Sequence, residues 1–302
     1  RHYPDIVDYL NAGDVLVIND TKVLKARLRA RKPSGGEREL VLVEQHGLSD
    51  DWFRHKVLYR RKLRAGETLL VGSDELIVEE ILGDGIAVIR SQRSLLNIAE
   101  EHGTVPLPPY MNRDATPADI ERYQTVFARA VGSVAAPTAS LNMTGEILAR
   151  LSAKGITVAR ATLHVGLGTF LPMRVDDIAK HTMHQEYFSI PAGTVAAIQA
   201  AKAGGSRVVA LGTTMTRTLE YAHQQILHQP PHGISGEADI FIYPGYEFQV
   251  IDALITNFHL PESTVLMLAA AFAGWDKLRP AYEHAIAGRY KFFSYGDSML
   301  IS

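Results

Sequence analysis

The chain has 302 residues, of which 46% are hydrophobic and 21% charged, a composition typical of a soluble globular protein of about two domains. It contains no cysteine, which excludes disulfides, thiolate metal sites and cysteine nucleophiles, and no apolar run approaches the ~18–20 residues that cross a bilayer. The net charge of −2, taken alone, argues against a nucleic-acid binder.

The first predicted elements form an all-β region. An apolar run at 15–18 predicts a buried strand. After it, Lys25, Arg27, Arg29 and Arg31 alternate with alanine and leucine, the period of two expected of a strand with one basic face in water. Five more short strands are expected at 39–45, 52–59, 68–71, 75–82 and 85–90. The strand that begins at Lys25 and these five make six short strands, whose spacing predicts a small closed barrel. The proline-rich segment 106–110 ends this region.

Positive charge is concentrated in this region. Residues 22–64 hold 13 Lys and Arg against five Asp and Glu, whereas the rest of the chain holds 18 against 28. A basic segment on an acidic body indicates a local site for a polyanion such as a nucleic acid. A solvated charged face is the other interpretation that the sequence leaves open.

Strand and helix patterns alternate from about residue 123 onward. Strands are expected at 157–165, 208–211, 239–243 and 251–256, and helices at 195–203, 216–227 and 262–272. Thr194 stands where it can cap the first of these helices. The alternation predicts a layered α/β sheet, which the strand at 15–18 joins. We therefore expect an α/β domain of residues 1–24 plus 106–302, with the barrel, 25–105, inserted into it.

Polar residues follow several of these strands, where open sheets place their ligands. Thr213 and Thr214 begin a helix that carries Arg217, a combination that suits an anionic group, although simple helix capping explains the threonines equally well. Asn257 and His259 lie two apart on extended backbone and share a face, so they could relay a proton or bind a base edge.

Two histidine segments offer further candidates. His164 lies near the end of a strand, before glycines that permit close approach of a ligand, but the third glycine of a dinucleotide fingerprint is missing. His184 and Glu186 can share a strand face. A hydrogen-bonded pair that tunes the imidazole is favoured over a zinc or iron site that also uses His181.

The loop 132–144, which contains Thr138 and Asn142, is small, polar and proline-containing. Such residues let a substrate lie against backbone amides. The loop holds no nucleophile beside a base, which argues against acyl-enzyme chemistry.

Ten segments match one family in the same order along the chain, among them Pro-Leu-Pro-Pro-Tyr at 106–110 and Phe-Phe-Ser-Tyr-Gly-Asp at 292–297. The segments are 17–23, 105–110, 122–128, 134–139, 162–170, 181–186, 212–220, 239–246, 254–264 and 292–297. Together they resemble the S-adenosylmethionine:tRNA ribosyltransferase-isomerases of queuosine biosynthesis. Members of that family usually have several dozen more residues before this point, so we expect that the native chain begins earlier than Arg1.

The resemblance implies an α/β domain with an inserted β-barrel. It also implies that the enzyme transfers and isomerises the ribosyl moiety of S-adenosylmethionine onto the aminomethyl group of a 7-deazaguanine in tRNA. The product is then epoxyqueuosine, with release of adenine and methionine. S-adenosylmethionine is a cosubstrate in this reaction, no cofactor is expected, and tRNA is the macromolecular partner. Neither a membrane nor an obligate protein partner is expected, and the expected location is the cytoplasm.

Residue type and position suggest roles within this reaction. The catalytic candidates are His164, His184, Glu186, Asn257 and His259. The substrate-binding candidates are Thr138, Asn142, Thr213, Thr214, Arg217, Tyr243 and Tyr246. The tRNA-binding candidates are Lys25, Arg27, Arg29, Arg31, Arg60, Arg61 and Lys62. No metal ligand is expected.

The chain departs from the family pattern in two places. Ser140-Leu141-Asn142-Met143 stands where the family usually has Gly-Leu-His-Phe, so an imidazole role cannot be carried over to Asn142. Leu58-Tyr59-Arg60 replaces an Arg-Pro-Gly type segment. A divergent paralogue that binds RNA or uses another acceptor without this activity is therefore the second hypothesis. A metal-dependent hydrolase built on His181, His184 and Glu186 is the third.

Overall fold

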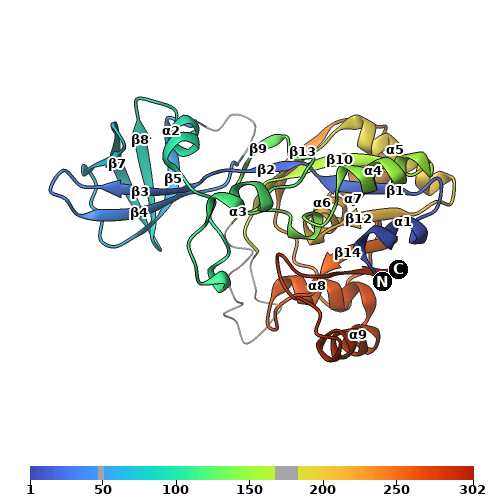
Figure 1. Ribbon diagram of the computed structural model, residues 1–302. Helices are drawn as coiled ribbons and strands as arrows, with labels where there is room; N and C mark the ends of the chain where they lie inside the picture. Colours follow the sequence, from blue (N-terminus) through green and yellow to red (C-terminus); the bar gives the residue numbers. More distant parts are fainter. Residues whose placement is uncertain (47–50, 167–182) are drawn as a thin grey trace.

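The computed structural model describes residues 1–46, 51–166 and 183–302, and it has a sheet domain and a closed barrel at opposite ends of an elongated molecule (Figure 1). The sheet has seven strands in the order β13-β11-β10-β1-β12-β14-β15. Their bounds are β1 (Val15–Asn19), β10 (Thr157–Leu163), β11 (Glu186–Ile190), β12 (Val208–Leu211), β13 (Ile234–Ala238), β14 (Ala253–Asn257) and β15 (Ser298–Ile301). The four central strands β10, β1, β12 and β14 are parallel neighbours, so their carboxyl ends meet at one edge.

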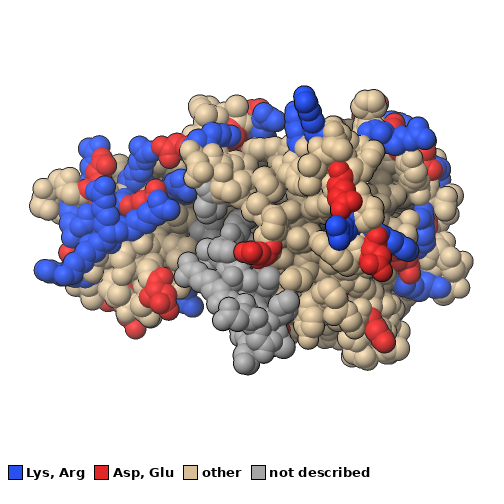
Figure 2. All heavy atoms as spheres, turned by 90° about the horizontal axis from the view of Figure 1, so that it is seen from below, with Lys and Arg blue, Asp and Glu red and all other residues tan. Residues whose placement is uncertain are grey.

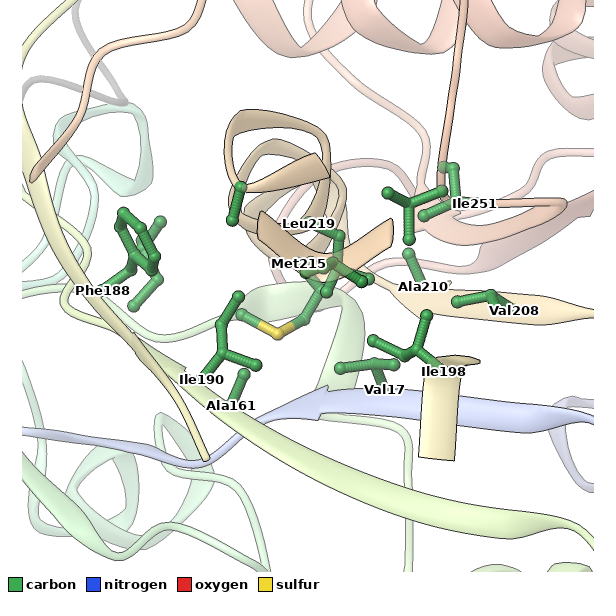
Figure 3. Close-up of a cluster of buried hydrophobic side chains, with 14 of the residues drawn as sticks. Val17, Ala161, Phe188, Ile190, Ile198, Val208, Ala210, Met215, Leu219 and Ile251 are labelled. Carbon is green, nitrogen blue, oxygen red and sulfur yellow. The ribbon is translucent and has the colours of Figure 1, made fainter. Parts of the chain in front are cut away.

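Helices cover both faces of this sheet. Their bounds are α1 (Ile6–Tyr9), α4 (Gly145–Ala153), α5 (Ala192–Ala203), α6 (Thr213–Tyr221), α7 (His223–His228), α8 (Thr264–Ala273) and α9 (Trp275–Ala287). Val17 packs with Met215 and Leu219 of α6 in one apolar cluster (Figure 3), whereas Leu16 and Ile18 belong to the cluster on the other face. The apolar run of β1 is therefore buried on both sides, as a central parallel strand requires.

The barrel closes in the order β3-β4-β5-β8-β7-β6. Its strands are β3 (Arg27–Arg31), β4 (Glu37–Leu42), β5 (Arg54–Arg60), β6 (Thr68–Val71), β7 (Asp74–Gly83) and β8 (Ile86–Ser91). The helix α2 (Leu95–His102) adds Leu95, Ile98 and Ala99 to the barrel core. The predicted fold class, an α/β layered sheet with a six-stranded barrel near the N-terminus, is confirmed.

The chain enters and leaves the barrel side by side. Arg27 N donates to Thr104 O at 3.0 Å, and Thr104 N donates to Arg27 O at 2.9 Å. The two chain segments that join the barrel to the rest of the protein therefore lie next to each other. This is expected of an inserted domain, because an insertion interrupts the host chain at a single place. We keep 25–105 as the proposed limits of the inserted domain, with 1–24 plus 106–302 as its host.

A short parallel ladder connects the two parts, β2 (Thr21–Val23) with β9 (Ala130–Ser133). The helix α3 (Pro117–Arg122) lies on the same connection. Neither element was predicted, since both are too short to show a periodic pattern. No helix in the described part of the chain has the length and apolar character needed to cross a membrane.

Two local predictions were wrong. Residues 239–243 are not a strand, because the β13 ladder ends where Ala238 meets Glu186 and the β11 strand offers no further partner. The Ile240 carbonyl instead accepts a hydrogen bond from Arg217 Nε at 3.2 Å. Thr194 does not cap α5, since Pro191 is the N-cap residue and Thr194 Oγ1 donates to the Arg160 carbonyl at 2.6 Å.

Candidate active site

A cavity of about 370 Å³ opens at the carboxyl ends of β12 and β14, the edge at which open α/β sheets bind ligands. Loops 136–139 and 258–263 and the segment 293–294 complete its wall. The lining residues are Tyr110, Ala136, Pro137, Thr138, Ala139, Val165, Gly212, Thr213, Thr214, Thr256, Asn257, Phe258, His259, Leu260, Pro261, Glu262, Ser263, Val265, Phe293 and Ser294. Its volume lies in the range of about 300–1,000 Å³ typical of small-molecule sites.

The start of α6 forms one wall of this cavity. Thr213 and Thr214 are its first residues and both line the cavity. The first N–H groups of a helix have no acceptor within it, and the helix dipole is positive there, so this wall favours a carboxylate or another anion. Asn19 at the end of β1 donates from Nδ2 to Thr214 Oγ1 at 3.5 Å, which ties the helix start to the central strand.

Asn257, at the end of β14, also lines the cavity and is fixed from two sides. Thr138 Oγ1 donates to Asn257 Oδ1 at 3.3 Å, and Asn257 Nδ2 lies 3.5 Å from both Ser298 Oγ and the Asp297 carbonyl. Thr138 and Asn257 both line the cavity. The structure thus brings together two residues that the sequence assigned to substrate binding and to catalysis.

His259 lines the same cavity, two residues beyond Asn257. Its backbone N donates to Tyr282 Oη at 2.8 Å, and its Nε2 lies 2.8 Å from Thr256 Oγ1. Burial lowers the pKa of His259 to about 4. The imidazole is therefore neutral near pH 7 and carries one N–H and one lone pair, so it can either donate or accept a proton.

His164 lies behind the wall. Its neighbour Val165 lines the cavity, whereas His164 itself is buried and places Nδ1 2.8 Å from Thr21 Oγ1. The ring stacks on Tyr187 with centroids 5.9 Å apart. Burial lowers the pKa of His164 to about 4. This placement suits a residue that positions the end of β10 better than one that touches a reacting atom.

Arg217 and Glu186 form a buried ion pair between α6 and β11. Glu186 Oε1 also accepts from Gly166 N at 3.0 Å, and Arg217 Nε donates to the Ile240 carbonyl. Among the described residues Arg217 Nη2 has no hydrogen-bond partner. Arg217 lines a small cavity together with Thr213 and Thr214, so its charge lies beside the start of α6.

His184 is exposed and precedes β11, whereas Glu186 is buried within that strand. Glu186 is committed to Arg217 and Gly166, which disfavours the metal-hydrolase hypothesis. His181 lies outside the described residues, and within them no three His, Asp or Glu side chains gather to hold a metal ion.

Three other substrate-binding candidates do not line the main cavity. Asn142 Nδ2 donates to the Gly296 carbonyl at 3.0 Å and borders a separate cavity of about 600 Å³ near the chain termini. Tyr246 Oη donates at 3.2 Å to the buried carboxylate of Glu220 and so holds a loop. Tyr243 is exposed, with its ring 5.2 Å from that of Phe241.

The predicted basic face of residues 25–31 is exposed at two of its four basic residues. Leu28 and Ala30 of β3 are buried, whereas Arg29 and Arg31 project into solvent with 79% and 72% of their side chains exposed. Arg60 of β5 joins them across Glu39 of β4. Lys25 Nζ lies 2.7 Å from Glu100, and the Arg27 side chain is mostly covered. Arg61 and Lys62 follow β5 and are exposed. Figure 2 shows the Lys and Arg side chains gathered over the barrel.

A cluster that the sequence did not predict joins the barrel to the sheet. His46, in the β4–β5 connection, places Nδ1 3.0 Å from Glu237 of β13 and Nε2 3.5 Å from Glu44. The Glu44 carboxylate lies against Gly166 at the end of β10, where a Cβ would force this carboxylate to shift. The carboxylates of Glu44 and Glu237 raise the pKa of His46 to about 9.

This cluster predicts a pH-dependent stability. The folded pKa of His46 exceeds its unfolded value of about 6.5, so the stabilisation is complete below about pH 6.5 and is lost as the pH rises through about 9. His46→Gln should remove part of the fall in unfolding temperature that the parent protein shows between pH 6.5 and 9. Thermal unfolding of both proteins across this range measures the difference, and parallel pH curves would contradict the assignment.

Comparisons with known proteins agree with this architecture. A family model described as queuosine biosynthesis protein matches residues 1–301. A protein named S-adenosylmethionine:tRNA ribosyltransferase-isomerase from Chlorobium phaeobacteroides is 53% identical over 302 residues, which cover 99% of this chain and 87% of that protein. The protein of the same name from Acinetobacter baumannii is 46% identical over 307 residues, with 99% of this chain and 87% of the relative covered.

A solved structure extends the likeness to the fold. The crystal structure of S-adenosylmethionine tRNA ribosyltransferase from Thermotoga maritima is 33% identical to this chain and matches it with a TM-score of 0.54. The match covers 100% of this chain and 87% of that one. The chain therefore belongs to the S-adenosylmethionine:tRNA ribosyltransferase-isomerase family of queuosine biosynthesis proteins.

Proposed function

We propose that this protein transfers and isomerises the ribosyl moiety of S-adenosylmethionine onto the aminomethyl group of a 7-deazaguanine base in tRNA. Epoxyqueuosine in tRNA, adenine and methionine are the products. The observation that carries the proposal is that the segments resembling the family's motifs line the main cavity. Each of the segments 134–139, 212–220, 254–264 and 292–297 contributes residues to its wall.

The cosubstrate supplies much of the chemistry. Its sulfonium acidifies the adjacent C5′ protons and makes methionine a leaving group. The protein has to provide a base for that proton, a hydrogen-bond donor for departing adenine, and a means of holding the acceptor amine. We infer that no cofactor is needed besides this cosubstrate, and that the reaction takes place in the cytoplasm.

The cavity offers groups of the required types. The neutral imidazole of His259 and the amide of Asn257 act at the ribose and adenine, where they accept or donate a proton or a hydrogen bond. Thr213 and Thr214 hold the carboxylate of the methionine part, and the positive charge of Arg217, which lines a small cavity with them, favours its binding. His164 positions the end of β10, and the face made by Arg29, Arg31 and Arg60 holds tRNA phosphates.

The departure from the family pattern at Asn142 is compatible with activity. Its side chain bonds the Gly296 carbonyl and Ser298 and borders the cavity near the termini. Asn142 therefore does not line the main cavity itself, and it reaches Asn257 only through the shared Ser298 hydroxyl. This placement favours the enzyme over a paralogue that only binds RNA.

Adenine release tests the proposal directly. The protein is incubated with S-adenosylmethionine and with tRNA that carries either the 7-aminomethyl-7-deazaguanine base or guanine at the same position. We expect release only with the modified tRNA. Bound tRNA without adenine release would overturn the proposal in favour of the paralogue.

Exchange of Arg29, Arg31 and Arg60 for alanine should weaken tRNA binding at every sequence tested. Each arginine that neutralises a phosphate contributes about 0.7–0.9 to the slope of log affinity against log salt, so the triple variant should lose about two units of slope. Binding measured from 50 to 300 mM salt gives the slope. Arg279→Ala on α9, an exposed arginine of the other domain, is the matched control. An unchanged slope in the triple variant would remove this face from the tRNA site.

A further inference from the structure

Two aromatic rings from distant parts of the sequence meet at the wall of the main cavity. Tyr110 is the last residue of the proline-rich segment at which the chain returns from the barrel, and Phe293 lies in the C-terminal segment. Their ring centroids are 5.3 Å apart with an interplanar angle of 55°. Both side chains are half-buried and line the cavity. Both belong to segments that resemble family motifs but received no role from the sequence.

The backbone at Phe293 adopts an uncommon conformation that presents this ring. Its φ of 72° lies in the left-handed region, which residues other than glycine rarely occupy and which clusters at functional sites. Phe293 N donates to the Phe258 carbonyl at 3.0 Å, and Gly296 N donates to the Phe293 carbonyl at 2.9 Å. A Cβ at Gly296 would overlap the carbonyl groups of Lys291 and Phe292, so the turn requires glycine there.

The Tyr110 ring is fixed through its hydroxyl group. That hydroxyl is hydrogen-bonded to Ser294 Oγ, and Ser294 N donates to it at 3.1 Å. Burial raises the pKa of Tyr110 above its ordinary value, so the phenol stays protonated at neutral pH. The two rings are therefore held in place by different means, one by its backbone and one by its side-chain hydrogen bonds.

We propose that Tyr110 and Phe293 form an aromatic wall on which a purine-type base stacks during the reaction. The inference rests on the proposed function, in which two such rings reach the cavity: the adenine of S-adenosylmethionine and the 7-deazaguanine of tRNA. A base that undergoes chemistry leaves the nucleic-acid stack and is commonly held between aromatic side chains. The polar groups that suit ribose and carboxylate, among them Thr213 and Asn257, line other parts of the same cavity.

The test measures equilibrium binding of three ligands to the full chain. These are S-adenosylmethionine, tRNA with the 7-aminomethyl-7-deazaguanine base, and the same tRNA with no base at that position. The variants are Tyr110→Leu and Phe293→Leu, which remove a ring, and Tyr110→Phe, which keeps it. Phe292→Leu is the matched control, since Phe292 is the adjacent aromatic residue and does not line the cavity. Thermal unfolding verifies that each variant is folded. If Phe293→Leu does not fold, Tyr110→Leu alone still tests the inference.

Stacking on one aromatic side chain is worth about tenfold or more in affinity. We expect Tyr110→Leu and Phe293→Leu to weaken one ligand about tenfold, with Phe292→Leu close to the parent. Tyr110→Phe keeps the ring but loses its hydrogen bonds to Ser294, so it should weaken the same ligand less than Tyr110→Leu does. Weaker S-adenosylmethionine binding identifies adenine as the stacked base. Weaker binding of the modified tRNA, with the tRNA that lacks this base unaffected, identifies the acceptor base.

Affinities that change no more than in Phe292→Leu would overturn the inference, as would an equal loss for both tRNAs with S-adenosylmethionine unaffected. These outcomes are independent of the proposed function, which fails only if the parent protein releases no adenine with modified tRNA.

Discussion

Replacing His259 by alanine is expected to lower the turnover number for adenine release by about 10²-fold or more, the usual contribution of a positioned acid or base. Two properties suit His259 to such a role: it lines the cavity, and its ring is oriented by Thr256. Burial lowers its pKa to about 4, so the imidazole is neutral at working pH and acts as a weak base. Single-turnover adenine release with saturating tRNA measures the effect on the chemical step.

The pH dependence gives a second readout for His259. A group with a pKa of about 4 does not titrate between pH 6 and 8, so the rate should show no inflection near 6.5 from this residue. The contribution of His259 to the rate should be lost only as the pH approaches 4, where the lone pair of its imidazole is protonated. His228→Ala, an exposed histidine on α7, serves as the control. Turnover unchanged in His259→Ala, with only substrate binding weakened, would reduce this residue to a binding role.

Regular elements were predictable because each depends on nearby residues. The alternation of basic and apolar residues in β3 and the turn residues between the barrel strands gave the barrel, and β6 and β12 were predicted at their observed bounds. The strand predicted at 239–243 was wrong because its extent depends on where β11 begins, about 50 residues earlier in the chain. A strand boundary of that kind is decided by tertiary pairing.

The same distinction applies to the site. Asn257 and His259 could be placed together because they are only two residues apart on one extended segment. Both line the cavity. His164 was expected beside them, but the side chain of a strand-end residue points to one of two faces, and here only Val165 reaches the cavity. Tyr110 with Phe293, and His46 with Glu237, are pairs about two thirds of the chain apart, so no local pattern connects them.

Arg217→Ala is expected to lower the free energy of unfolding by about 3–5 kcal/mol, because it leaves the buried carboxylate of Glu186 without its countercharge. Denaturant unfolding measures this loss. The pair also fixes α6 against β11, so the variant should bind S-adenosylmethionine more weakly as well, since Thr213 and Thr214 begin that helix. Arg279→Ala breaks an exposed pair with Glu283 and should change stability by less than about 1 kcal/mol.

The double variant Arg217→Met with Glu186→Gln separates the two effects of Arg217. Removing both charges avoids an unpaired buried carboxylate, so its stability should lie much closer to the parent than that of Arg217→Ala. If Arg217 only holds the fold, the double variant should also recover most of its affinity for S-adenosylmethionine. Among the described residues, Arg217 Nη2 has no hydrogen-bond partner, and Arg217 shares a small cavity with Thr213. If the Arg217 charge therefore attracts the carboxylate of the cosubstrate, the affinity of the double variant for S-adenosylmethionine should stay low although its stability returns. Equal recovery of both quantities would therefore confine Arg217 to a structural role.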